Sequence, residues 1–123
     1  MPSRLSQFVR LLPCLMLLGL ACHPASIAGI TVDGHSRTVT ALLGQEVRIT
    51  LWAVGPGEYE APPQVTSPIL AFITASYIPP YTPGGANQEF RFATDGRGRA
   101  IVHFRRVLND SLIATVDDTV DVR

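Results

Sequence analysis

The chain has 123 residues, of which 46% are hydrophobic and 16% charged, and its ten basic residues balance its ten acidic ones. This length leaves room for one small domain after an N-terminal signal, and the balanced charge offers no basic field for nucleic acid. We therefore expect a single globular domain without a nucleic-acid partner.

The first segment has the features of an export signal. Met1–Arg10 carries two arginines and no acidic residue, and an apolar stretch then runs from Leu11 to Ala21. That stretch of about 11 residues is roughly half of what spans a bilayer as a helix. Cys22 follows Ala21 directly and resembles the acylated cysteine of bacterial lipoproteins.

This resemblance implies a division of the chain and a location. Residues 1–21 are expected to be a lipoprotein-type signal peptide, 22–28 a short tether and 29–123 the folded domain. Acylation of Cys22 would anchor the domain to a membrane, on the outer membrane or the periplasmic face of the cell envelope, because more than one acyl chain anchors stably. An ordinary secretory signal cut nearby and an uncleaved anchor are the alternatives.

The remainder of the chain shows apolar residues alternating with polar ones, and glycine and proline recur too often for long helices. This pattern is typical of half-buried strands. The expected strands, in chain order, are 26–32, 37–42, 46–51, 69–76, 87–93, 99–105 and 118–123. About seven short strands without a disulfide predict an all-β fold, an immunoglobulin-like β-sandwich.

Three local patterns give further expectations. Asp95-Gly96 between two alternating segments predicts a β-hairpin, since glycine accepts a positive φ. Trp52 is expected to cover an edge of the core, with an exposed anchor as the alternative. The acidic residues Asp117, Asp118 and Asp121 are expected to lie on a solvated strand face.

Catalytic patterns are missing from the sequence. His23, His35 and His103 have no partner at metal-ligand spacing, and no serine lies in a nucleophile elbow. No glycine-rich phosphate loop opens a helix. We therefore expect neither an enzyme nor a metal or cofactor site.

Five segments in the same order resemble the chagasin family of cysteine-peptidase inhibitors, whose fold is an immunoglobulin-like sandwich. These segments are Leu43–Leu51, Val54–Glu60, Thr66–Leu70, Pro83–Phe92 and Gly96–Arg106. Val107 and Leu108 stand where the family has Pro-Trp after its last matching strand. The resemblance covers most of the expected domain.

The resemblance also implies a function and a site. In the family, three loops fill the cleft of a papain-like cysteine peptidase by occlusion, without a covalent step. The matching positions are Gly55, Pro56, Gly57, Glu58, Tyr59, Pro83, Gly84, Gly85, Arg106 and Leu108. The expected partners are thus a membrane, through the lipid, and a cysteine peptidase or another envelope protein. The alternative is an immunoglobulin-like adhesion or scaffold lipoprotein with no peptidase target.

Overall fold

The computed structural model describes residues 27–32, 37–53, 55–82 and 85–123, and for 27–32, 79–82 and 85 the backbone alone. The predicted signal peptide and Cys22 lie outside the described residues. The described chain forms nine strands and no helix, so no helix of this part could cross a membrane. The strands are β1 (Ile27–Val32), β2 (Thr38–Ala41), β3 (Glu46–Leu51), β4 (Glu58–Tyr59), β5 (Gln64–Val65), β6 (Leu70–Thr82), β7 (Gly85–Thr94), β8 (Gly98–Leu108) and β9 (Ser111–Val122).

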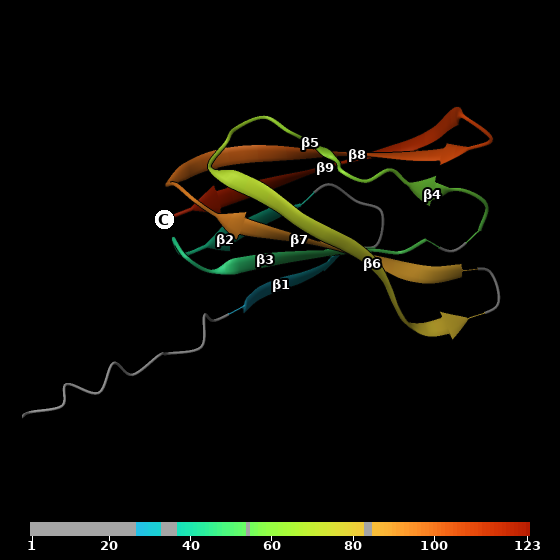
Figure 1. Cartoon of the computed structure of the whole chain (residues 1–123), viewed down its shortest axis with the longest axis horizontal. Coiled ribbons are helices and arrows are strands. Elements are labelled where there is room, and N and C mark those ends of the chain that lie inside the picture. The colour runs from blue at the N-terminus through green and yellow to red at the C-terminus, as the bar shows by residue number, and fades with distance from the viewer. Residues whose placement is uncertain (1–26, 33–36, 54, 83–84) are drawn as a thin grey trace, which may run out of the picture.

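The strands build two stacked sheets (Figure 1), which confirms the predicted β-sandwich. One sheet has the order β1-β3-β7-β6, and the other has the order β2-β9-β8-β4, with β5 also paired to β8. The outer strands β1 and β2 pair in parallel with β3 and β9. All seven predicted strands are present, and the two-residue strands β4 and β5 are additional.

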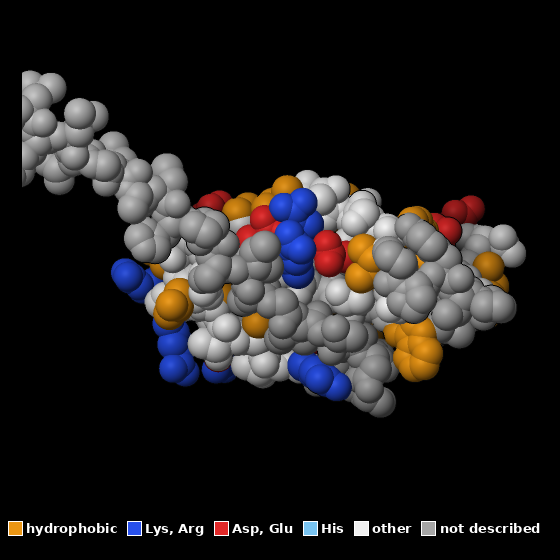
Figure 2. Space-filling view, turned by 90° about the horizontal axis from the view of Figure 1, so that it is seen from below, with side chains coloured by type: hydrophobic (Ala, Val, Ile, Leu, Met, Phe, Trp, Pro, Cys, Tyr) orange, Lys and Arg blue, Asp and Glu red, His pale blue; other side chains and the backbone are white. Residues whose placement is uncertain are grey.

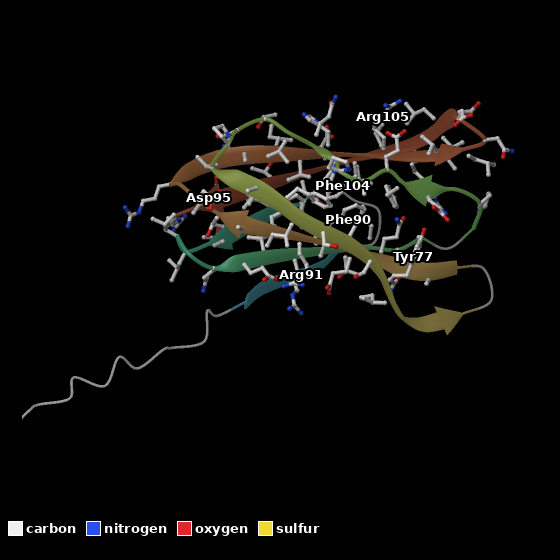
Figure 3. All side chains as sticks on the ribbon, in the orientation of Figure 1. Tyr77, Phe90, Arg91, Asp95, Phe104 and Arg105 are labelled. Atoms are coloured by element: carbon white, nitrogen blue, oxygen red, sulfur yellow. The ribbon has the colours of Figure 1, made fainter. Side chains whose placement is uncertain are left out.

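The predicted hairpin at Asp95-Gly96 is wrong. β7 and β8 flank this turn but belong to different sheets, so the turn carries the chain from one sheet to the other. The reason lies in the side chains. Phe90 of β7 and Phe104 of β8 face each other across the sandwich, with ring centroids 4.9 Å apart in an edge-to-face arrangement (Figure 3). Side chains that face each other from opposite sides of the core must come from different sheets, so β7 and β8 do not pair as a hairpin.

The core lies between the sheets and follows the predicted alternation. Every second residue is buried from Val47 to Leu51 in β3, from Gln88 to Thr94 in β7 and from Ala100 to Phe104 in β8. Fully burying one of the large apolar side chains among them contributes about 1.5–3 kcal/mol. Among the described residues the core contains no cysteine, and apolar packing joins the two sheets.

The outer face of the first sheet carries a charge network. Glu46 of β3 accepts from Arg91 of β7, with Nη2 to Oε2 at 2.7 Å, and from Arg48 Nε at 3.1 Å. Figure 2 shows the basic and acidic side chains gathered on this face. The hydrogen bond from Arg91 holds the pKa of Glu46 at about 2. The network ties β3 to β7 on the side facing away from the core.

The prediction of a solvated acidic face is wrong for Asp118. Its side chain points into the core between Val116 and Val120 and is fully buried. Its Oδ1 accepts from the backbone N–H of Arg37 at 3.0 Å, at the start of β2. Asp121 is half-buried and bonds Arg99 Nε at 2.8 Å, and Asp117 is exposed beside His103.

Candidate functional site

The three segments implied by the resemblance lie at one end of the sandwich, opposite the C-terminus (Figure 1). The first is the turn before β4, the second joins β6 to β7, and the third is the tip between β8 and β9. Pro83 and Gly84 lie outside the described residues, but the flanking residues Thr82 and Gly85 are register partners. We call this region the loop end.

The first segment depends on two glycines in the left-handed region of backbone space. Gly55 has φ of +93° and Gly57 has φ of +88°. A Cβ on Gly57 would lie 2.7 Å from the Val107 carbonyl oxygen and 2.8 Å from Cδ1 of Ile113. Glycine is therefore required at position 57, where the first segment rests against the β8–β9 tip. Pro56 is exposed between the two glycines.

Tyr59 anchors this segment instead of presenting its ring. The ring is buried against Phe104, with centroids 6.4 Å apart. The side chain of Gln88 accepts from Tyr59 N at 2.8 Å and donates to Tyr59 O at 3.1 Å. Gln88 belongs to the opposite sheet, so it holds β4 in place from across the sandwich. Sequence reasoning missed Gln88, because it read as one polar position in an alternating strand.

The third segment is a strand pair with a tight turn. β8 runs through Leu108, and Asn109 and Asp110 form the turn with φ of +48° and +63°. Positive φ at both central residues is the geometry of tight hairpins, and Asn and Asp tolerate it better than most residues. Arg106 precedes this turn and lies within β8. Its guanidinium carbon lies 5.7 Å from the centroid of the Tyr59 ring.

Exposed apolar side chains gather near these segments. Leu108, Leu112 and Ile113 of the β8–β9 tip are 38%, 50% and 46% exposed. Trp52, just beyond β3, is 57% exposed, so the expectation that it covers the core edge is wrong and the alternative of an exposed side chain holds. The alternation of β3 places Trp52 on the outer face of the sheet, between the buried residues Leu51 and Ala53. Leu112 and Ile113 carried no sequence signal, since no strand was predicted there.

A cleft opens between the sheets at the loop end. Its volume is about 370 Å³, and it is lined by Glu58, Tyr59, Glu60, Ala61, Ala75, Ser76, Tyr77, Gln88 and Val107. Tyr77 lies on the half of β6 nearer the loop end (Figure 3). Partial burial and a hydrogen bond to the Glu58 carboxylate raise the pKa of the Tyr77 hydroxyl.

The described residues contain no cluster of metal-ligating side chains, since no three of their His, Cys, Asp or Glu side chains are placed to hold a metal ion. His103 contacts Asp117 at 2.6 Å on the outer face of β8 and β9, away from the cleft. What the loop end offers is a shaped surface and a cleft, which are features of binding.

Comparison with known proteins agrees with this architecture. No protein-family model matches the sequence, and no curated protein matches it either. Among solved structures, the chain is similar to the cysteine protease inhibitor EhICP2 from Entamoeba histolytica, with a TM-score of 0.63 and 10% identity over 79% of this chain and 96% of that one. Amebosin matches with a TM-score of 0.47 and 14% identity over 82% of this chain and all of that one. The likeness to EhICP2 confirms the chagasin-like fold.

Proposed function

We propose that this protein inhibits papain-type cysteine peptidases by inserting its loop end into the active-site cleft. The observation that carries the proposal is the gathering of three sequence-distant segments at one end of the sandwich, with exposed apolar side chains around them. A solved structure with this fold is a cysteine protease inhibitor. A few well-packed side chains at the centre of an interface supply most of its binding energy, so a surface with exposed Trp52 and apolar neighbours suits occlusion of a cleft.

The mechanism is steric, and the catalytic groups of the peptidase do not react with the inhibitor. The turn at Gly55–Gly57 enters the active-site cleft of the peptidase. The β6–β7 turn and the β8–β9 tip contact the peptidase on either side of that cleft. Gly57 lets the first segment approach the third closely, because a Cβ at this position would collide with both Val107 and Ile113. No bond forms or breaks, and the catalytic residues are shielded from substrate.

The purified protein is expected to inhibit papain with a constant on the order of nanomolar. Leu108→Ser should weaken inhibition about tenfold, because it removes an apolar contact at the loop end. Leu42→Ser is the matched control, since Leu42 is 58% exposed in the β2–β3 turn at the opposite end. A protein without inhibition at about 100 μM would refute the proposal and favour an adhesion or scaffold role.

The location of the domain is a second part of the proposal. Cys22 is the residue that we expect to be acylated, with the protein held at the cell envelope. In a bacterial host fed a labelled fatty acid, the full chain should carry label and sediment with membranes. Cys22→Ser should lose both properties, whereas Cys14→Ser should keep them; label on the Cys22→Ser protein would exclude this site.

A further inference from the structure

The cleft between the sheets has a composition that points to one kind of ligand. Its walls include the aliphatic side chains Ala61, Ala75 and Val107, and the partly exposed ring of Tyr77. Among the described residues that line it none is basic, and two, Glu58 and Glu60, are acidic. A volume of about 370 Å³ falls at the lower end of the range of ligand pockets, which is about 300–1,000 Å³.

The two carboxylates differ in how their negative charges are balanced by neighbouring groups. Glu60 pairs with Arg105, with Oε2 and Nη1 3.3 Å apart, and Arg105 projects from the outer side of β8 (Figure 3). Glu58 is hydrogen-bonded to Tyr77, a neutral group. The ion pairs found between described residues do not include Glu58. The negative charge of Glu58 is therefore left for a cation from outside.

The tyrosine beside Glu58 favours a flat cation. A guanidinium can stack on an aromatic face and still offer two N–H groups to one carboxylate, which an ammonium cannot do. The same fold already uses such a contact nearby, where the guanidinium of Arg106 lies 5.7 Å from the centroid of the Tyr59 ring. The aliphatic walls suit the methylene stem of the incoming side chain.

We infer that this cleft receives an arginine side chain from a protein partner. The guanidinium lies against the ring of Tyr77 and pairs with the carboxylate of Glu58, and its stem packs on Ala75 and Val107. The pocket shares Glu58 and Tyr59 with the first segment of the loop end but does not include Leu108 of the apolar tip, and the inference stands whether or not the partner is a peptidase.

The test uses the purified protein and a capped tripeptide, acetyl-Gly-Arg-Gly-amide, followed by NMR. Saturable shifts are expected at the amides of Glu58, Ala75 and Tyr77, and the same peptide with norleucine in place of arginine should produce none. Glu58→Gln should weaken binding about tenfold, because it removes a charge-assisted hydrogen bond. Tyr77→Phe keeps the ring and should change binding by less than about threefold.

Asp110→Asn is the matched control, since Asp110 is an exposed carboxylate on the nearby tip that does not line the cleft. It should leave binding unchanged. Equal binding of the norleucine peptide, shifts spread over the surface, or equal losses in Glu58→Gln and Asp110→Asn would overturn the inference. Because this assay contains no peptidase, its failure would leave the inhibition measurements to be judged separately.

Discussion

Replacing Gly57 by alanine is expected to destabilise the protein by about 2–4 kcal/mol and to weaken papain inhibition at least tenfold. The new Cβ would lie 2.7 Å from the carbonyl oxygen of Val107, a backbone atom that cannot move without disturbing β8. The residue would also have to keep a φ of +88°. Relief requires the first segment to move away from the β8–β9 tip, which separates two parts of the proposed contact surface.

Gly44→Ala separates the two causes of this effect. Gly44 also has a φ of +88°, but a Cβ added there meets nothing within 4 Å. Its cost should therefore be the backbone strain alone, about 1 kcal/mol. Urea unfolding of the two variants measures the difference, and inhibition by Gly44→Ala should equal that of the parent. Equal destabilisation by both substitutions would show that the contact with Val107 is relieved without cost.

Asp118→Asn is expected to stabilise the protein by about 1–3 kcal/mol at pH 8 and to remove most of the dependence of stability on pH between 4 and 8. Burial raises the pKa of Asp118 from 3.8 to about 6, while the N–H of Arg37 opposes the shift. A raised pKa means that the folded state prefers the protonated carboxyl. The contribution of Asp118 to the free energy of unfolding is therefore most favourable below about pH 4, and this contribution is lost as the pH rises through about 6.

The matched control is Asp117→Asn, the neighbouring carboxylate, which is exposed on the opposite face of β9. Asp117→Asn removes the contact with His103, and beyond that loss it should change the free energy of unfolding by less than about 0.5 kcal/mol. Thermal unfolding from pH 4 to pH 8 provides the comparison. A parent protein whose stability rises steadily over this range, with Asp118→Asn following it, would contradict the assignment.

The sequence predicted the strands because apolar alternation follows the pleat of each strand directly. Val47, Ile49, Phe90 and Phe92 all occupy the core face that the alternation indicates. Local patterns were weaker guides to connectivity. Asp95-Gly96 has hairpin chemistry, but the choice between a hairpin and a crossing depends on which apolar faces must meet, and that is a property of the whole fold.

The candidate site was predictable in part. The positions of the three segments followed from the resemblance, and the structure brings the described parts of them to one end. The roles of individual residues did not follow. Trp52 is exposed because it lies on the outward-facing side of the alternation that β3 begins. Tyr59 is buried because its ring packs against Phe104 of β8, a contact between distant segments that alternation cannot show. Gln88 acts through its partner in another sheet, which no local pattern encodes.

The double hydrogen bond between Gln88 and the backbone of Tyr59 has a consequence for affinity. It fixes the C-terminal end of the first segment, while β3 fixes the other end at Leu51. This turn is fixed at both ends, and Gly57 lets it pack closely against β8. It therefore has few conformations to lose on association. Preorganisation of this kind lowers the entropic cost of binding, so a surface of modest area can hold a partner tightly without a covalent bond.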